Sequence, residues 1–439
     1  MQPIHNILLA FYGDDLTGST DALEFICTAG ANALLFLDPP DVNDLERYPG
    51  LQAYGVAGLT RSLPPEKMEE VLVRVFQTMK STGAKHVHYK VCSTFDSSPT
   101  VGSIGKAIDI GANVFHSKPT PVIGGTPALG RFCVFGHLFA RMGIGTAGKI
   151  FRLDRHPSMS RHPVTPSTES DLRVHLGSQT AKKIGLIDLT RMELELEKWK
   201  DAIDEGDEIV LLDALTVEQL EKIGEWLEVQ TASGQTLFSA GSSAVEMALG
   251  LYWKSKGLLE EKNFDYHPTS QAPLLVLSGS CSPVTTKQID YALKHGFLEL
   301  PLKMKQDRFV DGNDNYLDDD VSIVANALRN NKNVIVHTGK IDGSTQPSSA
   351  DFLGTLLGKI AAKVAEQFSL KRLVIAGGDT SSYAARAMGV EALEMIAPFV
   401  SGAPLCRVHS ANNHIDGMEI NLKGGQVGGE GYFVQIQNI

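Results

Sequence analysis

The amino-acid sequence predicts an α/β protein of two domains, each a mostly parallel β-sheet flanked by helices, with a cleft between the domains. Three observations support this fold class. The chain has 439 residues, more than a single hydrophobic core usually serves. Short continuous apolar runs alternate with longer amphipathic stretches, which is typical of βαβ units. A polar stretch at residues 254–273 separates two such series. We therefore expect one domain over residues 1–260, a second over residues 261–439, and a hinge within the polar stretch.

The expected strands are short and almost wholly apolar, as in sheets that are covered on both faces. In the first domain they lie within residues 6–13, 32–38, 51–61, 85–94, 181–189, 207–214 and 235–241. In the second domain they lie within residues 274–280, 333–339 and 372–380. Helical spacing of apolar residues predicts helices over residues 19–30, 64–83, 283–296, 351–368 and 381–390. The segment 111–166 is rich in Gly, Pro and Arg. We expect functional loops there rather than disorder, because it also holds many aromatic and apolar residues.

Composition and charge narrow the class of protein. Hydrophobic residues make up 43% of the chain and charged residues 21%, a normal mix for a globular protein. The formal net charge of −11 argues against nucleic acid or an anionic membrane as the main partner, but not against a small anionic ligand. The five cysteines are scattered without a C-x-x-C pair, and no stretch is long and apolar enough to span a bilayer. We therefore expect a cytoplasmic protein in a reducing compartment.

Polar side chains follow three strands of the expected N-terminal sheet. They are Asp14, Asp15, Arg61, Lys90, Ser93, Thr94 and Asp96. Because the carboxyl ends of parallel strands share one edge of a sheet, we expect these side chains to lie together. Carboxylates bind hydroxyl groups, and Arg and Lys bind carboxylate or phosphate, so the set fits a small polyhydroxylated acid. For Asp15, capping of the following helix is a competing explanation.

Small residues fill three turns of the expected C-terminal domain. Two turns connect a strand to a helix, at residues 276–285 and 374–382, and the third is the glycine-rich stretch 422–433. Backbone N–H groups in such turns can approach phosphate, and the N-terminus of the following helix favours an anion. Hydroxyl donors are available at Ser278, Ser280 and Thr380. Three such turns in one domain predict a nucleotide site.

A further glycine-rich stretch, GIGTAGK at residues 143–149, nearly matches a phosphate-binding loop. The next residue is Ile150, where magnesium binding would need a Ser or Thr hydroxyl, and no strand-to-helix junction brackets the stretch. We interpret it as a hairpin turn. An NAD-dependent dehydrogenase that uses this stretch is a weaker alternative, because the preceding strand and a ribose-binding acid are missing.

Two histidines and two arginines of the irregular segment have open roles. His156 and His162 are not spaced like a metal-binding pair on a helix, and we expect them to fix the loop instead. Arg131 and Arg155 are candidates for contact with an anion, with surface or structural pairing as an equal alternative.

Six motifs, in chain order, resemble the four-carbon acid sugar kinase family. They are GDDLTGSTDA, YKVCSTFDSSPTVGSIG, PALGRFCVFGHLFA, RLDRHPSMSRHPVTPSTESDLR, LSGSCSPVTTKQI and VIAGGDTSSYAARAMGV. The resemblance covers nearly the whole chain, and the STFDS run is similar to the 3-oxo-tetronate kinase branch. Two stretches depart from the family. KGGQVGG stands where K-S-G-N-F-G is frequent, and SSPTVGSIG stands where that branch has G-N-I-G.

The resemblance implies an N-terminal domain that binds a sugar acid and a C-terminal domain that binds ATP with Mg²⁺. The implied reaction phosphorylates the terminal hydroxyl of threonate, erythronate or 3-oxo-tetronate. The strand-end residues named above would then face the sugar acid. The residues implied to hold the nucleotide are Ser278, Gly377, Gly378, Asp379, Thr380, Gly424 and Gly425. The expected partners are these small molecules rather than nucleic acid or membrane, and a homodimer is left open.

For the transfer itself, we expect Asp15 to orient the attacking hydroxyl and accept its proton, with Asp96 as the second candidate. Arg61 and Lys90 would bind the substrate carboxylate or the transferred phosphoryl group. No metal site of the protein's own is predicted. The alternative from another class is a non-catalytic sugar-acid sensor on the same scaffold. The intact small-residue turns of the C-terminal domain argue against that alternative.

Overall fold

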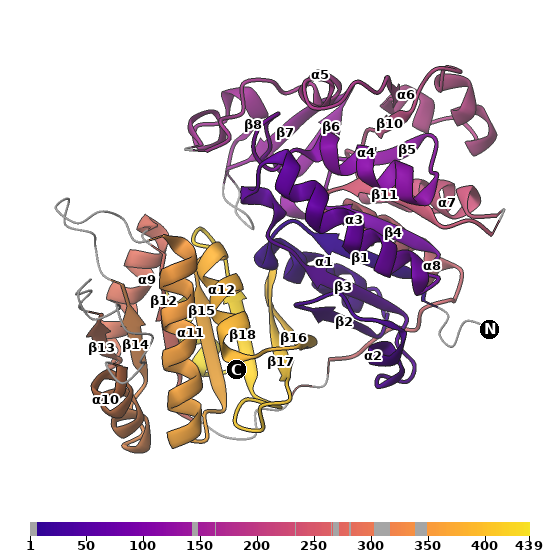
Figure 1. Ribbon diagram of the computed structural model, residues 1–439. Coiled ribbons are helices and arrows are strands. Elements are labelled where there is room, and N and C mark those ends of the chain that lie inside the picture. The colour runs from indigo at the N-terminus through magenta and orange to yellow at the C-terminus, as the bar shows by residue number, and fades with distance from the viewer. Residues whose placement is uncertain are drawn as a thin grey trace. The chain divides into compact units, whose positions relative to one another are not determined.

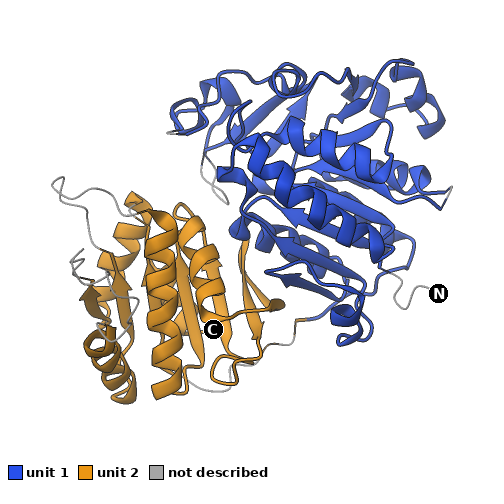
Figure 2. Ribbon diagram, viewed as in Figure 1, with its two compact units in different colours: residues 1–263 blue, residues 264–439 orange. Residues whose placement is uncertain are grey.

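The chain forms two compact units in the computed structural model, residues 1–263 and residues 264–439 (Figure 2). The structure describes residues 7–142, 148–162, 164–232, 234–264, 266, 272–280, 282–302, 317–338 and 349–439. The division between the units falls close to the expected boundary after residue 260. Within the described ranges, every helix is too short or too polar to cross a membrane.

The main sheet of unit 1 is parallel between all its described neighbours, in the order β2-β3-β1-β4-β11-β5-β10-β9 (Figure 1). Its strands are β1 (Leu9–Gly13), β2 (Ala33–Phe36), β3 (Ala53–Ala57), β4 (His86–Lys90), β5 (Thr120–Ile123), β9 (Ile184–Ile187), β10 (Ile209–Leu212) and β11 (Leu237–Gly241). The strands β1 and β3 are buried along their whole length, which explains their continuous apolar sequence.

Helices cover this sheet in two groups (Figure 1). The helices of unit 1 are α1 (Leu16–Thr28), α2 (Val42–Glu46), α3 (Pro65–Ser81), α4 (Ile104–Phe115), α5 (Leu172–Gly177), α6 (Leu189–Met192), α7 (Val217–Gln230) and α8 (Ala244–Ser255). Helix α3 packs against α4, whereas α8 packs against both α7 and α1. The strand order with right-handed crossovers puts these two groups on opposite faces of the sheet. The sequence pattern did not predict α4.

The segment 111–166 is more regular than expected. It contains an antiparallel sheet of β6 (Arg131–Val134), β7 (His137–Arg141) and β8 (Ile150–Arg152). Short 3₁₀ helices lie there and elsewhere in unit 1: η1 (Thr60–Ser62), η2 (Pro127–Leu129), η3 (Leu153–Arg155), η4 (Met159–Arg161) and η5 (Leu196–Ala202). Along β7 buried and half-buried residues alternate, as expected for a strand with one covered face. The segment therefore holds strands as well as the expected loops, and the hairpin expected at residues 143–149 falls between β7 and β8.

The glycine-rich stretch GIGTAGK connects β7 to β8. Its residues 143–147 lie outside the described residues. The flanking strands pair antiparallel, and the Met142 N–H donates to the Lys149 carbonyl oxygen at 3.0 Å. This pairing fits the expected hairpin and not a strand-to-helix phosphate loop.

Unit 2 has a second sheet, in the order β13-β14-β12-β15-β18-β17-β16. Its strands are β12 (Leu275–Ser278), β13 (Leu298–Pro301), β14 (Val334–His337), β15 (Arg372–Ala376), β16 (Ala392–Val400), β17 (Ala403–His409) and β18 (Glu419–Lys423). The strands from β13 to β18 in this order are parallel, and β17 and β16 extend the sheet antiparallel. The sequence pattern did not predict the β16–β17 hairpin.

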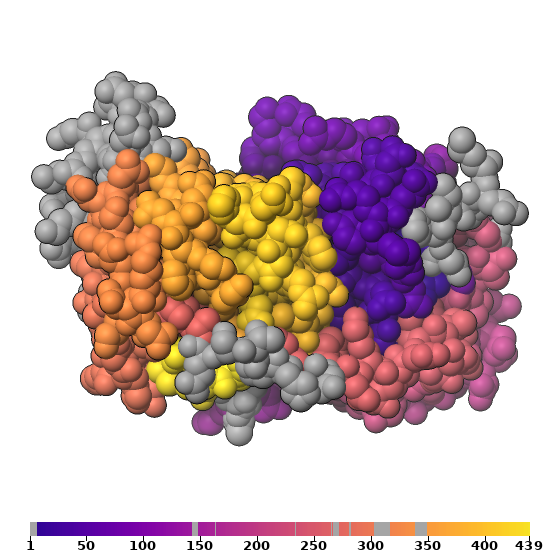
Figure 3. Space-filling model, turned by 90° about the horizontal axis from the view of Figure 1, so that it is seen from below, coloured from indigo at the N-terminus to yellow at the C-terminus, as the bar shows by residue number. Residues whose placement is uncertain are grey.

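The helices of unit 2 also form two groups. They are α9 (Pro283–Lys294), α10 (Asp318–Arg329), α11 (Ala350–Gln367), α12 (Gly378–Met388) and α13 (Tyr432–Gln437). Helix α11 packs against α10 and α12, and α13 packs against α9. Val276, Ile289 and Tyr432 belong to one buried core that joins the sheet to α9 and α13. In the space-filling view the C-terminal part of unit 2 (yellow) packs directly against its earlier part (orange) (Figure 3).

Candidate active site

The adjacent aspartates Asp14 and Asp15 lie at the carboxyl end of β1. Asp14 is 3% exposed and directly follows the last residue of the strand. Asp15 is the N-cap of α1, where its Oδ1 accepts the Gly18 N–H at 2.9 Å and its Oδ2 accepts the Thr17 hydroxyl at 2.8 Å. Capping is therefore one real role of Asp15. It does not explain why a second carboxylate stands beside it.

Arg61, in the turn after β3, binds both aspartates. Its Nε and Nη2 donate to the two oxygens of Asp14 at 3.1 and 2.6 Å, and Nη2 also donates to Asp15 Oδ1 at 2.8 Å. Burial raises the pKa of Asp14 above its ordinary value, and Arg61 opposes this only in part. Burial would also raise the pKa of Asp15, but Arg61 and Lys90 reverse the direction and lower it. Asp15 is thus ionised at neutral pH.

Lys90, the last residue of β4, completes a cluster of charges around Gly18. Its side chain is almost fully buried, and its Nζ is 3.6 Å from Asp21 Oδ2. A Cβ atom at Gly18 would lie 2.4 Å from Asp15 Oδ1, 3.1 Å from Lys90 Nζ and 3.4 Å from Arg61 Nη2. The bare backbone of Gly18 therefore leaves space where an acid and two cations converge.

The loop after Lys90 carries the remaining predicted residues of the sugar-acid site. The Thr94 hydroxyl donates to Asp96 Oδ1 at 2.8 Å, and Ser93 is 9% exposed. Parallel pairing sets Gly13 opposite both Ala57 and Lys90, so the residues after β1, β3 and β4 share one edge of the sheet. The structure thus brings the predicted residues of this unit to one edge. Hydrogen bonds join Arg61 to Asp14 and Asp15, and a separate hydrogen bond joins Thr94 to Asp96.

Asp21 and Ser243 are two residues of this edge that the sequence pattern missed. Asp21 lies one helical turn after Gly18, and its Oδ2 accepts a short hydrogen bond from the Ser243 hydroxyl. Ser243 follows β11, which lies next to β4 in the sheet. A search for polar residues one turn into each helix, in addition to strand ends, would have found Asp21.

The two candidate arginines of the irregular segment differ sharply. Arg131 is 8% exposed and donates through Nη1 to the carbonyl oxygens of Leu129 and Arg141, while its Nε is buried without a described partner. Burial lowers the pKa of Arg131, although Cys92 and two aspartates favour its charged form. Arg155 is 76% exposed and lies 3.4 Å from Asp154. Arg131 therefore keeps a candidate role at the site, whereas Arg155 has a surface pairing.

His156 and His162 fix their loop, as expected. The Nδ1 atom of His156 accepts the N–H groups of Ser158 and Met159, both at 3.2 Å. The Nδ1 atom of His162 accepts the Thr165 N–H at 3.1 Å.

Three strand ends of unit 2 bring the predicted nucleotide turns together. Ser278, Ala376 and Lys423 are the last residues of β12, β15 and β18, and parallel pairing sets Ser278 and Lys423 on either side of Ala376. The turns with Ser280, with residues 377–380 and with residues 424–425 therefore all start from one edge of the sheet.

The three turns also contact one another directly. Thr285 donates through Oγ1 to the Gly425 carbonyl oxygen at 3.0 Å, and the Ser282 hydroxyl makes a shorter bond to the same oxygen. A Cβ atom at Gly425 would lie 2.7 Å from Ser280 Oγ. Gly377 has a φ of +124°, and a Cβ atom there would lie 2.8 Å from Thr380 Oγ1. Glycine at these positions permits the close packing of the turns.

Lys423 is a buried cation at the same edge, which the sequence pattern missed. Its Nζ donates to Thr285 Oγ1 at 3.3 Å and lies 5.5 Å from the centre of the Tyr432 ring. Burial lowers the pKa of Lys423 to about 8. The Ser278 hydroxyl, at the end of β12 on the other side of β15, is also buried and has no hydrogen-bond partner among the described residues. These polar groups suit an anionic ligand, which would supply the missing acceptors.

The chain matches two family descriptions in succession, a sugar-binding N-terminal domain over residues 9–249 and a nucleotide-binding C-terminal domain over residues 275–433. It is 39% identical to the 3-oxo-isoapionate kinase of Paraburkholderia graminis, over 98% of this chain and 94% of that protein. This chain belongs to the four-carbon acid sugar kinase family. It is therefore a phosphotransferase with an alcohol group as acceptor.

Other relatives agree with this membership. A 3-oxo-tetronate kinase of Salmonella typhimurium is 26% identical over 97% of both chains. A crystal structure of a Salmonella typhimurium protein matches with a TM-score of 0.78 at 22% identity, covering 98% of this chain and 99% of that one, which supports the fold alone. The predictions of family, enzyme class and fold class are confirmed. Kinase membership and the nucleotide-binding domain together imply ATP as the phosphoryl donor.

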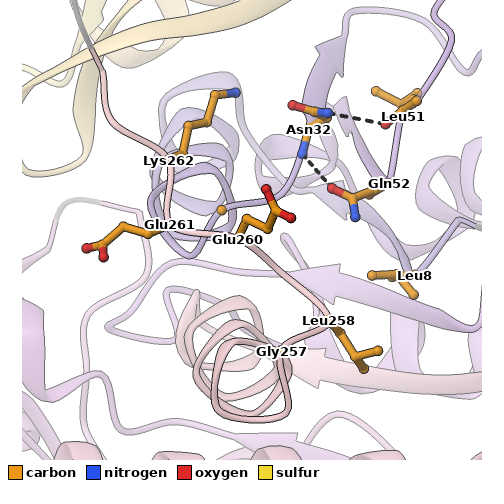
Figure 4. A pocket seen from close by; sticks show the side chains of 11 residues that line it. Leu8, Asn32, Leu51, Gln52, Gly257, Leu258, Glu260, Glu261 and Lys262 are labelled. Atoms are coloured by element: carbon orange, nitrogen blue, oxygen red, sulfur yellow. Dashed lines mark hydrogen bonds between the residues drawn. The ribbon is translucent and has the colours of Figure 1, made fainter.

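A pocket of about 730 Å³ lies elsewhere in unit 1 of the kinase (Figure 4). Leu8, Asn32 and Gln52 in its lining directly precede β1, β2 and β3, so it lies at the amino ends of these strands. The Asn32 N–H donates to Gln52 Oε1 at 3.1 Å, and Glu260 and Lys262 approach from the segment after α8. This pocket is at the opposite edge of the sheet from the charged cluster, and none of the predicted site residues lines it.

Proposed function

We propose that this kinase transfers the γ-phosphoryl group of ATP to the terminal hydroxyl of a small sugar acid bound at the Asp14–Arg61–Lys90 edge of unit 1. The observation that carries the proposal is the convergence of Asp15, Arg61 and Lys90 on Gly18, with Asp14 bound to the same Arg61 guanidinium group. Carboxylates select hydroxyl groups, and the cations select an anionic oxygen, so the edge is complementary to a hydroxy acid.

The choice of acid starts from the named relatives. Both names, 3-oxo-isoapionate kinase and 3-oxo-tetronate kinase, describe a 3-oxo acid. The higher identity to the former, 39% against 26%, makes 3-oxo-isoapionate the first substrate that we would test. The four-carbon acids 3-oxo-tetronate, threonate and erythronate follow it.

In this proposal each polar residue of the edge has one task. Arg61 and Lys90 bind the carboxylate of the acid or the transferred phosphoryl group, and Asp14 keeps the Arg61 guanidinium in place. Asp15 orients the attacking hydroxyl and takes its proton late in the transfer, with Asp96 as the second candidate. A low pKa suits Asp15 for this task, because an orienting carboxylate must be ionised to accept a hydrogen bond. Ser93 and Thr94 supply further hydroxyl groups for hydrogen bonds to the acid.

The nucleotide has its proposed site at the three turns of unit 2. Ser278, Ser280 and Thr380 would donate hydroxyl hydrogen bonds, while Gly377, Gly378, Gly424 and Gly425 let backbone N–H groups approach the phosphates. Mg²⁺ would be bound mainly by the phosphates, which it neutralises. Asp379, in the first turn of α12, is the carboxylate that we propose to face the ion, because without a cation it would repel phosphate.

An ADP-release assay with purified protein, ATP and Mg²⁺ tests the proposal against a panel of the named acids. We expect acid-dependent ADP release with at least one 3-oxo acid. If ATP and Mg²⁺ leave the thermal midpoint unchanged while an acid raises it, the chain acts as a sugar-acid sensor. Absence of ADP release together with absence of acid binding would overturn the proposed substrate class.

A further inference from the structure

Asp21 is a third carboxylate at the unit 1 edge. It lies on α1, is 8% exposed, and accepts a hydrogen bond at Oδ2 from the Ser243 hydroxyl. The same Oδ2 is 3.6 Å from Lys90 Nζ. Its other oxygen, Oδ1, is buried and has no hydrogen-bond partner among the described residues.

Asp14 and Asp15, at the end of β1, each accept hydrogen bonds at both of their carboxylate oxygens. Asp14 accepts N–H groups of Arg61 at Oδ1 and Oδ2. Asp15 accepts from Gly18 and Arg61 at Oδ1, and from the Thr17 hydroxyl at Oδ2. Buried polar atoms in native proteins are nearly always hydrogen-bonded, so an unbonded one needs an explanation. Among these three carboxylates, Asp21 Oδ1 is the one oxygen without any hydrogen bond, whereas Asp15 Oδ2 accepts one and keeps a second lone pair for the attacking hydroxyl.

The charges around Asp21 favour an anionic hydroxy compound as that ligand. Lys90 approaches from β4. The negative charge of Asp21 also favours the charged form of Arg131, on β6, so the two groups attract each other. The 3.6 Å between Lys90 Nζ and Asp21 Oδ2 exceeds an ordinary N–H···O hydrogen bond, so the ammonium group can also turn toward a ligand. Glu246, on α8, adds a negative charge, but His88 contacts its Oε1 at 2.6 Å.

We propose that Asp21 is a substrate-binding residue, whose Oδ1 accepts a hydrogen bond from a hydroxyl group of the sugar acid. Through its Oδ2 it also holds the Lys90 ammonium group beside the anionic end of the same acid. This inference rests on the proposed function and adds a residue to it. Because Asp21 lies one turn after Gly18 on α1, it reaches the same edge as the charged cluster around Gly18.

The variant Asp21→Asn tests the inference, with Asp38→Asn at an exposed position as the matched control. Asn keeps an oxygen that can accept from Ser243 but loses the charge that pairs with Lys90. We expect the KM for the sugar acid to rise about tenfold or more, with the KM for ATP changed less than about twofold. Acid protection in a thermal-shift assay should weaken in parallel. A purely structural Asp21 would lower the thermal midpoint and leave the KM for the acid unchanged, which would overturn the inference.

The pH profile gives a second readout. Burial raises the pKa of Asp21 above its ordinary value, while Lys90 opposes this; the charge of Glu246 raises the pKa further, and Arg131 is a second cation that interacts electrostatically with Asp21. Protonation removes the negative charge that pairs with Lys90 and, at Oδ1, replaces the free acceptor with an O–H donor, so wild-type kcat/KM for the acid should fall on the acid side of the profile. Asp21→Asn should lose or shift that limb, and an identical limb in both proteins would contradict the inference.

Two further outcomes separate this inference from the proposed function. If Asp21→Asn does not fold, Ser243→Ala removes the hydroxyl that holds Oδ2, and the KM for the acid should rise about threefold or more. An unchanged KM in Ser243→Ala overturns the inference. If the wild-type protein turns over none of the acids, the proposed function fails and this inference fails with it. If the wild type is active and both variants match it, only the role of Asp21 is wrong.

Discussion

Arg61 donates to both carboxylate oxygens of Asp14, at 2.6 and 3.1 Å, and with the same Nη2 atom to Asp15 at 2.8 Å. One guanidinium group therefore offsets the repulsion between two adjacent aspartates. A planar group with a fixed fork of donors can do this, whereas the single ammonium group of a lysine cannot.

Replacement of Arg61 should reduce both activity and stability. Arg61→Ala leaves the buried Asp14 without its partner. We expect the free energy of unfolding to fall by about 1–3 kcal/mol. This is less than for a fully buried ion pair, because the Arg61 side chain is 28% exposed. We also expect kcat/KM for the acid to fall about a hundredfold or more. Arg61→Lys should recover part of the stability but little of the activity. Equal recovery of both would show that charge alone matters here. Chemical denaturation and steady-state kinetics measure the two effects.

Asp15→Asn separates the capping role from the proposed catalytic role. Asn is as good an N-cap as Asp, so the thermal midpoint should change little. The amide cannot take the proton of the attacking hydroxyl, and kcat should fall about a hundredfold or more. Asp41→Asn is the matched control, because Asp41 caps the remote helix α2. Near wild-type turnover in Asp15→Asn would move the base assignment to Asp96.

Gly377→Ala should weaken nucleotide binding selectively. The φ of +124° disfavours any side chain, and the new Cβ atom would lie 2.8 Å from Thr380 Oγ1. We expect the KM for ATP to rise about tenfold while the KM for the acid stays within about twofold. Gly83→Ala is the control, since Gly83 also has a positive φ, of +73°, but open space around it. Unchanged ATP kinetics in Gly377→Ala would place the nucleotide elsewhere.

Lys423 should make the stability of the protein depend on pH. Its folded pKa of about 8 lies below the ordinary lysine value of 10.5, so the unfolded chain binds the proton more tightly. This group therefore destabilises the fold fully below about pH 8, and the effect disappears as the pH rises towards the ordinary lysine value.

The variant Lys423→Met removes this penalty. At about pH 7 it should be more stable than the wild type by roughly 1–3 kcal/mol, and the difference should shrink by about pH 10. Thermal midpoints at the two pH values measure the difference, with Lys371→Met at an exposed position as the control. A variant that is less stable than the wild type by the same amount at both pH values would contradict this account of Lys423.

The strand-end argument explains why much of the site was predictable from the sequence. Buried strands of a parallel sheet are mostly apolar, and polar side chains stand at their carboxyl ends, as Asp14 does directly after β1 and Lys90 does as the last residue of β4. Register then follows from parallel pairing, which brings Arg61 to the same edge. The same argument found Ser278 and the turn at Gly377 in unit 2.

Other residues of the site could not be predicted, because their positions depend on structural features that the local sequence pattern does not show. Asp21 reaches the edge through the period of helix α1 and not through a strand end. Its partner Ser243 is 222 residues away in sequence, and the two meet because β11 pairs with β4, a strand order that apolar runs do not specify. Lys423 ends β18, a strand that the sequence pattern did not predict, because the stretch 422–433 indicates only a glycine-rich turn.

The product of the reaction tests the central claim most directly. Phosphorus and proton NMR of wild-type protein incubated with ATP, Mg²⁺ and 3-oxo-isoapionate or 3-oxo-tetronate would locate the transferred group. The account predicts a new phosphate ester on the terminal carbon of one of these acids, formed in step with ADP and strongly reduced in Asp15→Asn. Inorganic phosphate as the only product, or an ester formed equally well by Asp15→Asn, would contradict it.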